Sequence, residues 1–203
     1  MSRPPIQFWF DFISPFGWFA SLRIGDIAAR HGRTVEWRPL LLGVTVLKVM
    51  GLKPVMDTPL KGDYAARQIA RYARRHGLRL ARDPAAPPMN PLPCARLFAW
   101  LRVHDAAHAQ AFACAVFDAY WAEGRALDEP ATLRVVALRA GLAPALVERG
   151  LADPAAAGLL RAEVEAAVAA GAFGSPFVIV DGEPFFGVDT LDQVDEWLAR
   201  GGW

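Results

Sequence analysis

The sequence is poor in cysteine. It contains only Cys94 and Cys114 among 203 residues, and it has no C-x-x-C motif. The two residues are widely spaced within Ala-rich segments, which suits neither a disulfide framework nor a zinc site. We therefore expect two small buried side chains, and dithiol exchange at a cysteine pair is excluded.

The sequence also lacks an excess of charge of either sign. It has 22 basic and 21 acidic residues, which gives a formal net charge of +1. No overall electrostatic field therefore attracts nucleic acid or an anionic membrane surface, and we interpret the basic run "RQIARYARRHGLRLAR" as a solvated helix face. A small molecule is the expected partner.

Several motifs that would indicate other functions are absent. The chain has no G-x-x-x-x-G-K-[ST], no G-x-G-x-x-G after a predicted strand and no G-x-S-x-G, so nucleotide-binding and hydrolase functions have little support. The segment "HDAAH", His104 to His108, is superficially similar to a zinc motif, but no clear third ligand follows it. No metal is predicted.

No long hydrophobic run is present either. The aromatic segment near the N-terminus is interrupted by Asp11 and is too short for a signal-peptide core or a membrane span. We therefore expect a cytoplasmic protein without a membrane partner. Hydrophobic residues make up 54% of the chain, which is enough to bury a core without disulfides or metal.

The sequence begins with a β-α-β pattern. Residues 6–12 are rich in aromatic side chains, as in a central strand covered on both faces. Pro15 suits the first position of a helix that continues to Gly32, and residues 33–42 alternate in part like a second strand. A short connection through one helix predicts that the two strands are parallel.

The remainder of the chain divides into a helical part and a β-β-α part. Residues 43–171 are Ala-, Leu- and Arg-rich, with a helical period interrupted by Gly and Pro. Two short β runs then flank Asp181-Gly182, a hairpin signal, and a last helix opens with Thr190 as its cap. The sequence thus predicts an α/β, thioredoxin-like fold (β-α-β … β-β-α) made of residues 1–42 and 172–203, interrupted by a large all-helical insertion domain, residues 43–171.

Two junctions in this fold are candidates for chemistry. Ser14 lies where the first strand meets the first helix, so its hydroxyl and the positive helix end can together hold a thiolate from another molecule. Helix capping by Ser14 is the simpler alternative, and the two roles are compatible. Pro176 in "FGSPF" stands where thioredoxin-like folds have a cis-proline, and an ordinary trans Ser-Pro bond is the alternative.

Five segments extend this pattern to a family resemblance. The sequence reads "FDFISPFGWFA" near the start, "TPLKGDY" at 58–64, "MNPLPCAR" at 89–96, "YWAEG" at 120–124 and "GSPFVIVDGEPFFGVDTLD" near the end. In this order they resemble the 2-hydroxychromene-2-carboxylate isomerase family, a glutathione-dependent, DsbA-like group related to kappa-class glutathione transferases. The resemblance spans almost the whole chain.

The resemblance implies glutathione as the cofactor, bound between the two parts of the fold with its thiol at Ser14. The backbone of Ser175, before a cis-Pro176, would pair with the glutathione backbone as an added strand. Asp189 would meet the glutathione α-amino group. The resemblance further implies a homodimer. It also implies that Lys61 and Asn90 are candidates for contacts with glutathione or an aromatic substrate. Four aromatic residues are candidates for the wall of an apolar pocket for the substrate, with core packing as the alternative: Phe16, Trp18, Trp121 and Phe186.

The chain departs from the family pattern at two positions in this implied glutathione site. Leu52 stands in "GLKP" where many relatives have asparagine, and Val188 stands where a polar residue often precedes Asp189. Both departures remove hydrogen-bonding groups. They predict a weaker or altered mode of glutathione binding, or a related thiol.

The reaction implied by the resemblance interconverts a cyclic hemiketal acid, 2-hydroxychromene-2-carboxylate, with its ring-opened isomer, the 2-oxo acid trans-o-hydroxybenzylidenepyruvate. Reversible thiolate addition makes a conjugated C=C bond temporarily single and permits rotation about it. Two alternatives stay open. One is a kappa-class-like glutathione transferase, whose product would keep the sulfur, and the other is a non-catalytic thiol- or peptide-binding protein that uses the proline groove.

Overall fold

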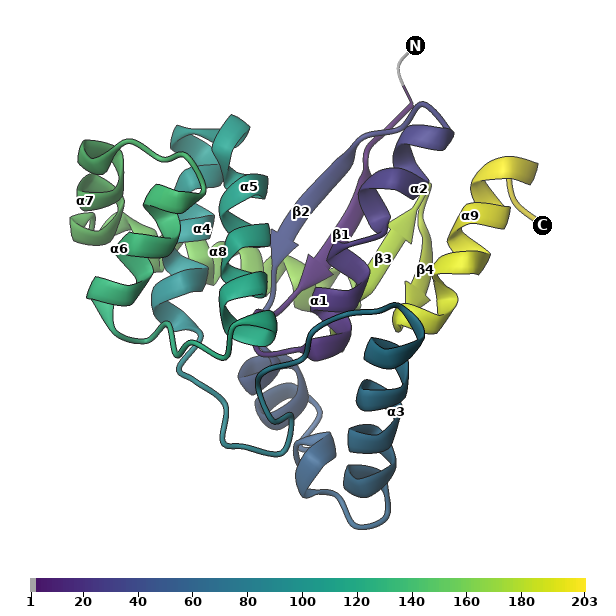
Figure 1. Ribbon diagram of the computed structural model, residues 1–203. Coiled ribbons are helices and arrows are strands. Elements are labelled where there is room, and N and C mark those ends of the chain that lie inside the picture. Colours follow the sequence, from purple (N-terminus) through teal and green to yellow (C-terminus); the bar gives the residue numbers. More distant parts are fainter. Residues whose placement is uncertain (1–2) are drawn as a thin grey trace.

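A four-stranded sheet forms the centre of the molecule (Figure 1). The structure is a computed structural model that describes residues 3–203. Strand β1 (Ile6–Phe10) pairs in parallel with β2 (Val35–Pro39) and antiparallel with β3 (Phe177–Val180), and β4 (Glu183–Phe186) extends the sheet beside β3. The order β2-β1-β3-β4 confirms the predicted β-α-β and β-β-α parts of a thioredoxin-like fold.

Strand β1 is buried on both faces, as its aromatic composition predicts. Phe8 and Phe10 belong to the larger core, in which the ring centres of Phe10 and Phe98 lie 5.2 Å apart. Trp9 belongs to a second, smaller core that contains Phe177. Because successive side chains of a strand point to opposite faces, β1 is held between two hydrophobic layers.

The single helix predicted before Gly32 is two helices, α1 (Pro15–Ser21) and α2 (Ile24–Arg30). At the break the Ser21 hydroxyl donates a hydrogen bond of 2.6 Å to a carbonyl one turn earlier in α1. Local bonds of this kind compete with the helical backbone pattern and bend helices. Pro15 does begin α1, and Gly32, with a φ of +61°, follows α2 in the left-handed conformation that glycine favours.

The predicted hairpin at Asp181-Gly182 is confirmed. The φ angles of these two residues are +53° and +94°, both positive as a type I′ turn requires. The Arg33 guanidinium donates two hydrogen bonds of 2.8 and 3.0 Å to the Asp181 carboxylate, and it also donates to the Pro4 carbonyl. The Arg33 side chain is only 1% exposed. It therefore ties the hairpin tip to the N-terminal segment.

The final helix, α9 (Leu191–Arg200), follows Thr190 as predicted. The predicted cap is not formed by the threonine side chain, however. Its hydroxyl donates a hydrogen bond of 2.9 Å back to the Gly187 carbonyl and accepts none from the helix. This local bond stabilises the short 3-10 turn η4 (Val188–Thr190) that precedes α9.

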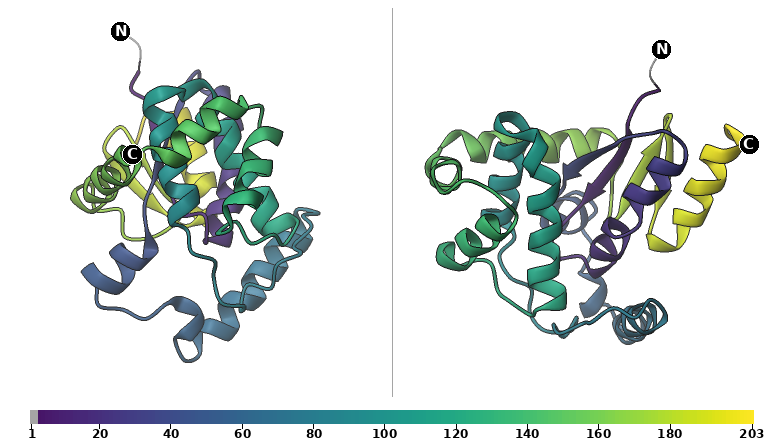
Figure 2. Two further views of the ribbon diagram at one scale, coloured as in Figure 1. Left: turned by 90° about the vertical axis from the view of Figure 1, so that its left-hand side faces the viewer. Right: turned by 45° about the horizontal axis from the view of Figure 1, so that its top comes forward.

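The predicted helical insertion lies between β2 and β3. Helices α4 to α7 form a lobe beside the sheet, whereas η1, η2 and α3 lie beyond the end of β1 (Figures 1 and 2). Among residues 3–203, no helix is long and apolar enough to cross a membrane. The elements are the π-helical segments η1 (Gly43–Val49) and η3 (Asp118–Ala122), the 3-10 turn η2 (Val55–Asp57), and the α-helices α3 (Lys61–Arg75), α4 (Leu92–His104), α5 (Ala106–Phe117), α6 (Pro130–Arg139), α7 (Pro144–Ala152) and α8 (Ala155–Ala169).

Charged side chains join the insertion to the sheet. Arg102 of α4 donates to Glu36 of β2 at 2.7 Å and also to Glu163 of α8, which accepts a further bond of 3.0 Å from Arg38 of β2. The Arg38 guanidinium lies 4.2 Å above the Trp9 ring. The predicted domain boundaries fall at the start of η1 and in the loop before β3, and the division into two domains stays a prediction.

Both cysteines are unpaired. Cys94 is fully buried and Cys114 is partly buried, so the expectation of two buried side chains holds for the first and in part for the second. Burial raises the pKa of both thiols, to about 11 for Cys114. Both side chains are therefore protonated and poorly nucleophilic at neutral pH.

Candidate functional site

Ser14 caps helix α1 at the point where β1 ends. Its Oγ accepts a hydrogen bond of 3.0 Å from the Gly17 N–H, and its backbone is extended. The residue is 4% exposed. The predicted N-cap is therefore confirmed, and it fixes the direction of the hydroxyl oxygen.

The two junctions singled out in the sequence meet in the structure. The Ser175-Pro176 peptide bond is cis, as the fold suggested, and the Ser14 hydroxyl donates a hydrogen bond of 2.9 Å to the Ser175 carbonyl. The hydroxyl therefore uses both its donor and one acceptor position within the protein. A sulfur atom beside Ser14 can accept a hydrogen bond from this hydroxyl only if the hydroxyl turns away from the Ser175 carbonyl.

Gly17 is required by the close approach of α1 to the Ser175 side chain. A Cβ atom at this position would lie 2.6 Å from the Ser175 Oγ and 3.3 Å from the Ser14 Cβ. Redox-active thioredoxin folds carry their second cysteine at the place of Gly17. The Ser175 hydroxyl occupies the space that such a side chain needs, so a residue larger than glycine requires α1 or the loop before β3 to shift.

Asp11 is a site residue that the sequence reasoning missed. It is 2% exposed, and its backbone N–H donates a hydrogen bond of 3.0 Å to the Ser175 Oγ. Its carboxylate accepts from the N–H groups of Ile13 at 3.2 Å and Leu42 at 2.8 Å. Burial raises the pKa of Asp11 to about 6, although these N–H groups oppose the rise. In the sequence, Asp11 could have been recognised as an acidic residue within the otherwise apolar end of the first strand.

Asp189 lies in η4, where it accepts a hydrogen bond of 3.0 Å from the Gln68 side chain of α3. The sequence predicted Asp189 as a partner for an amino group but missed Gln68. Only one carboxylate oxygen takes part in this bond, so the other can receive a cation. The neighbouring Val188 side chain is 2% exposed and belongs to the core, which places it away from any ligand-accessible surface.

Three other predicted contact residues lie on the exposed segments beyond β1. Leu52 is 53% exposed, Lys61 is the exposed first residue of α3, and Asn90 precedes α4. The Asn90 side-chain oxygen accepts a hydrogen bond of 3.1 Å from the Leu92 N–H. Within residues 3–203 none of the three side chains hydrogen-bonds to the Ser14 hydroxyl, and their roles stay predictions.

The four aromatic candidates divide into two kinds. Trp121 is 3% exposed and its indole N–H donates a hydrogen bond of 3.0 Å to the Phe12 carbonyl, and Trp18 is equally buried. Both tryptophans thus pack in the core and hold the strand end in place. Phe16 is half-buried and Phe186 is 48% exposed, so these two rings are accessible to a ligand.

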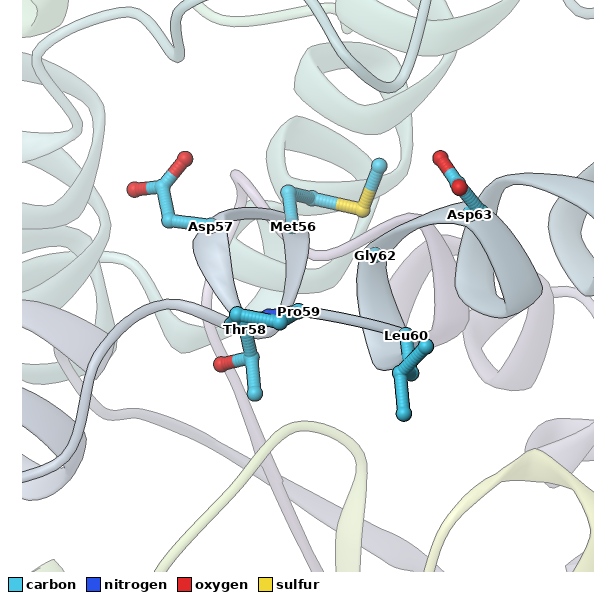
Figure 3. A pocket seen from close by; sticks show the side chains of 7 residues that line it. All are labelled: Met56, Asp57, Thr58, Pro59, Leu60, Gly62 and Asp63. Carbon is cyan, nitrogen blue, oxygen red and sulfur yellow. The ribbon is translucent and has the colours of Figure 1, made fainter.

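A cavity of about 210 Å³ lies at the junction of η2 and α3 (Figure 3). The carboxylates of Asp57 and Asp63 point to one side of the junction, and the side chains of Thr58 and Leu60 point to the other. A second cavity of similar size lies between β2, α4 and α5. Neither is lined by Ser14, and no cluster of three or more metal-ligating side chains occurs in the described part of the chain.

Comparisons with known proteins agree with this geometry. The model of the DSBA-like thioredoxin domain family matches residues 5–199. The 2-hydroxychromene-2-carboxylate isomerase of Sphingobium xenophagum is 32% identical over 95% of this chain and 97% of its own length, and that of Pseudomonas putida is 26% identical over 96% and 94%. A solved structure of 2-hydroxychromene-2-carboxylate isomerase superimposes with a TM-score of 0.80 and 26% identity, covering 97% of this chain and 95% of the other.

Proposed function

The chain belongs to the DSBA-like thioredoxin domain family, in the branch of the 2-hydroxychromene-2-carboxylate isomerases, and on this premise we propose that it is a glutathione-dependent isomerase. Its substrate would be 2-hydroxychromene-2-carboxylate, or a related intermediate of aromatic degradation, interconverted with the ring-opened 2-oxo acid. The named relatives support the class of reaction, and the geometry at Ser14 supports the thiol dependence.

The observation that supports the proposal is that the junction of Ser14 with the cis-Pro176 loop contains no thiol of the protein. Ser14 and the cis-Pro176 loop meet as they do around the reactive cysteine of a redox-active thioredoxin fold, but the chain has no thiol there. Cys94 and Cys114 lie on α4 and α5 and are protonated at neutral pH. A thiol that reacts at Ser14 must therefore come from a bound molecule.

The residues present fit the groups of glutathione. The Ser14 hydroxyl can donate to a thiolate, and the Gly17 N–H holds the hydroxyl oxygen in place. Helix α1 has only seven residues, so we assign the main stabilisation to the hydroxyl itself. The second Asp189 oxygen suits the α-amino group, with Gln68 fixing the carboxylate.

Glutathione would supply a thiolate whose reversible addition allows rotation about the conjugated C=C bond of the substrate. The chain's own part is to hold that sulfur deprotonated and close to the substrate. A hydrogen bond to a charged group contributes about 1.5–3 kcal/mol. To reach the sulfur the hydroxyl gives up its bond to the Ser175 carbonyl, which contributes about 1 kcal/mol. Ser14 would therefore lower the pKa of the bound thiol by about 1, since each pKa unit corresponds to about 1.4 kcal/mol.

The test is calorimetric titration of the protein with reduced glutathione, combined with the ultraviolet absorbance of the thiolate and an isomerase assay. We expect Ser14→Ala to abolish the thiolate signal near neutral pH and to reduce turnover about tenfold to a hundredfold. Ser21→Ala is the matched control, because its hydroxyl bonds within α1 and lies away from the site. Native turnover in Ser14→Ala would refute the role of this serine.

Product analysis separates the isomerase from the kappa-class-like transferase. An isomerase returns glutathione unchanged, whereas a conjugating enzyme leaves the sulfur in the product. We extend the proposal to a cytoplasmic homodimer. Two unpaired cysteines suit a reducing compartment, and residues 47–55 carry several exposed apolar side chains that a second copy would cover. Light scattering after gel filtration measures the oligomeric state.

A further inference from the structure

Asp11 connects the segments that meet at Ser14. Its carbonyl accepts the Ser14 N–H at 3.0 Å, and its own N–H donates to the Ser175 Oγ at 3.0 Å. Its carboxylate accepts the Leu42 N–H at 2.8 Å and the Ile13 N–H at 3.2 Å. Among residues 3–203, Asp11 is the only acidic residue that is buried.

The bond to Leu42 reaches a part of the site that is remote in the sequence. Leu42 directly precedes η1, the start of the exposed segment that carries Leu52 and leads to Lys61. The Asp11 carboxylate thus sets where this segment leaves the sheet. The backbone C=O and N–H of the same residue bond to the Ser14 N–H and the Ser175 hydroxyl, so one residue contacts both sides of the site.

The charge state of Asp11 sets the strength of the two bonds that its carboxylate accepts, from the Ile13 and Leu42 N–H groups. An ionised carboxylate accepts charge-assisted hydrogen bonds from both N–H groups, whereas a protonated one is a neutral acceptor with one O–H. Protonation therefore weakens the bonds from the Leu42 and Ile13 N–H groups, because a neutral carboxyl group is a poorer acceptor than a carboxylate, and Ile13 is the neighbour of Ser14. Burial raises the pKa of Asp11 to about 6, which brings this change close to the physiological range.

No charged side chain lies close enough to Asp11, within residues 3–203, to hold it in one protonation state. The titratable side chains that sense its charge are Cys94 of α4 and Tyr120 of η3. Burial raises the pKa of both groups, so both are neutral around pH 6. From β1 and the loop before β3 only Ser175 and backbone groups reach Asp11, and within residues 3–203 it forms no ion pair with arginine, lysine or histidine.

We propose that Asp11 is a positioning residue of this site: its charged carboxylate holds Ile13, which adjoins Ser14, and the segment after Leu42 in the arrangement that binds ligand, and its protonation weakens binding. The inference rests on the proposed glutathione function. It assigns Asp11 no contact with the substrate.

The experiment measures the binding of S-methylglutathione from pH 5 to pH 8 by calorimetry. This probe has no ionisable thiol, so the pH dependence reports groups of the protein. We expect the native dissociation constant to increase about tenfold as the pH falls through 6, which corresponds to the loss of one hydrogen bond to a charged group. Asp11→Asn, which always presents one donor and one acceptor, should bind weakly at every pH.

Asp118→Asn is the matched control. It removes one negative charge and keeps an amide oxygen that can accept the hydrogen bond of 3.0 Å from the Trp18 indole of α1, and Asp118 is exposed and has no hydrogen bond with Ser14 or Ser175. It should keep the native pH profile. Identical profiles in the native protein and Asp11→Asn, with both variants folded by circular dichroism, would overturn the proposal.

A second readout separates failure of this inference from failure of the proposed function. The amide proton resonances of Ile13, Ser14 and Leu42 should titrate together near pH 6 in the unliganded native protein and should not titrate in Asp11→Asn. If the native protein does not bind glutathione but these resonances titrate, the glutathione function fails and the positioning role stands. If they do not titrate, the positioning role is refuted whatever the protein binds.

Discussion

Replacing Gly17 with alanine tests whether the Ser175 side chain really fills the space beside α1. The added Cβ would lie 2.6 Å from the Ser175 Oγ, well inside the 3.4 Å at which ordinary contact begins. Ser175 cannot easily move away, because its hydroxyl accepts the Asp11 N–H and its carbonyl accepts the Ser14 hydroxyl. The overlap must therefore be absorbed by α1 or by the loop before β3.

The expected magnitude follows from two opposing effects. Overpacking of a tight site costs about 1–3 kcal/mol, and alanine regains about 1 kcal/mol over glycine inside a helix. We expect a net decrease of up to about 2 kcal/mol in the free energy of unfolding, or a melting temperature lower by up to about 8 °C for a chain of this size. Urea unfolding at pH 7 measures the free energy directly.

Gly25→Ala is the control for this substitution. Gly25 lies in α2, and a Cβ there would meet nothing within 4 Å. This variant should gain up to about 1 kcal/mol of stability from helix propensity alone. If Gly17→Ala were as stable as Gly25→Ala, the close approach of α1 to Ser175 would be refuted.

A double substitution makes the test more specific. Ser175→Ala removes the oxygen that the new Cβ would meet, but it leaves the Asp11 N–H without its acceptor, at a cost of about 1–3 kcal/mol. In Gly17→Ala combined with Ser175→Ala the overlap is gone. The double variant should therefore be at least about 1 kcal/mol more stable than the sum of the single changes predicts.

Two further predictions concern pH and stability. Asp11→Asn should gain stability relative to the native chain between pH 4 and pH 7. The folded pKa of about 6 lies above the ordinary aspartate value of 3.8, so the stability that protonated Asp11 contributes below pH 3.8 is lost as the pH rises through 6. This difference corresponds to about 3 kcal/mol, and equal pH profiles in urea unfolding would contradict it. The opposite sign applies to Asp181, because the hydrogen bonds from Arg33 lower its pKa. Asp181→Asn should destabilise the protein by about 1 kcal/mol at pH 7, a small value because the half-exposed carboxylate is partly screened by solvent. This loss of stability should shrink as the pH falls below 3.8. A loss that is constant down to pH 2 would show that Arg33 acts on Asp181 through packing alone.

Those parts of the fold that depend on neighbouring residues were predictable from the sequence. Pro15 after Ser14 indicated a capped helix start, and Asp181-Gly182 indicated a turn with two positive φ angles. The aromatic run of β1 indicated burial on both faces. In each case the physical cause lies within a few residues of its effect.

The features that the sequence reasoning missed depend on contacts between distant segments. The Leu42 N–H reaches the Asp11 carboxylate across 31 positions, and Gln68 reaches Asp189 across 121. The closeness of Gly17 to Ser175 is likewise a product of packing. Propensity and periodicity do not encode such pairs, so the single buried carboxylate of the site was overlooked. The break between α1 and α2 was missed because nothing around Ser21 marks a helix end in the sequence.

The packing of Gly17 against Ser175 also constrains how this chain can evolve. A lineage that needed a dithiol here would have to place cysteine at both 14 and 17, yet a side chain at 17 meets the Ser175 hydroxyl. Loss of that hydroxyl first would strip the Asp11 N–H of its acceptor. Each single substitution is therefore expected to lower the free energy of unfolding, whereas the two made together avoid the steric overlap. The glycine thus opposes the acquisition of a second cysteine at this position.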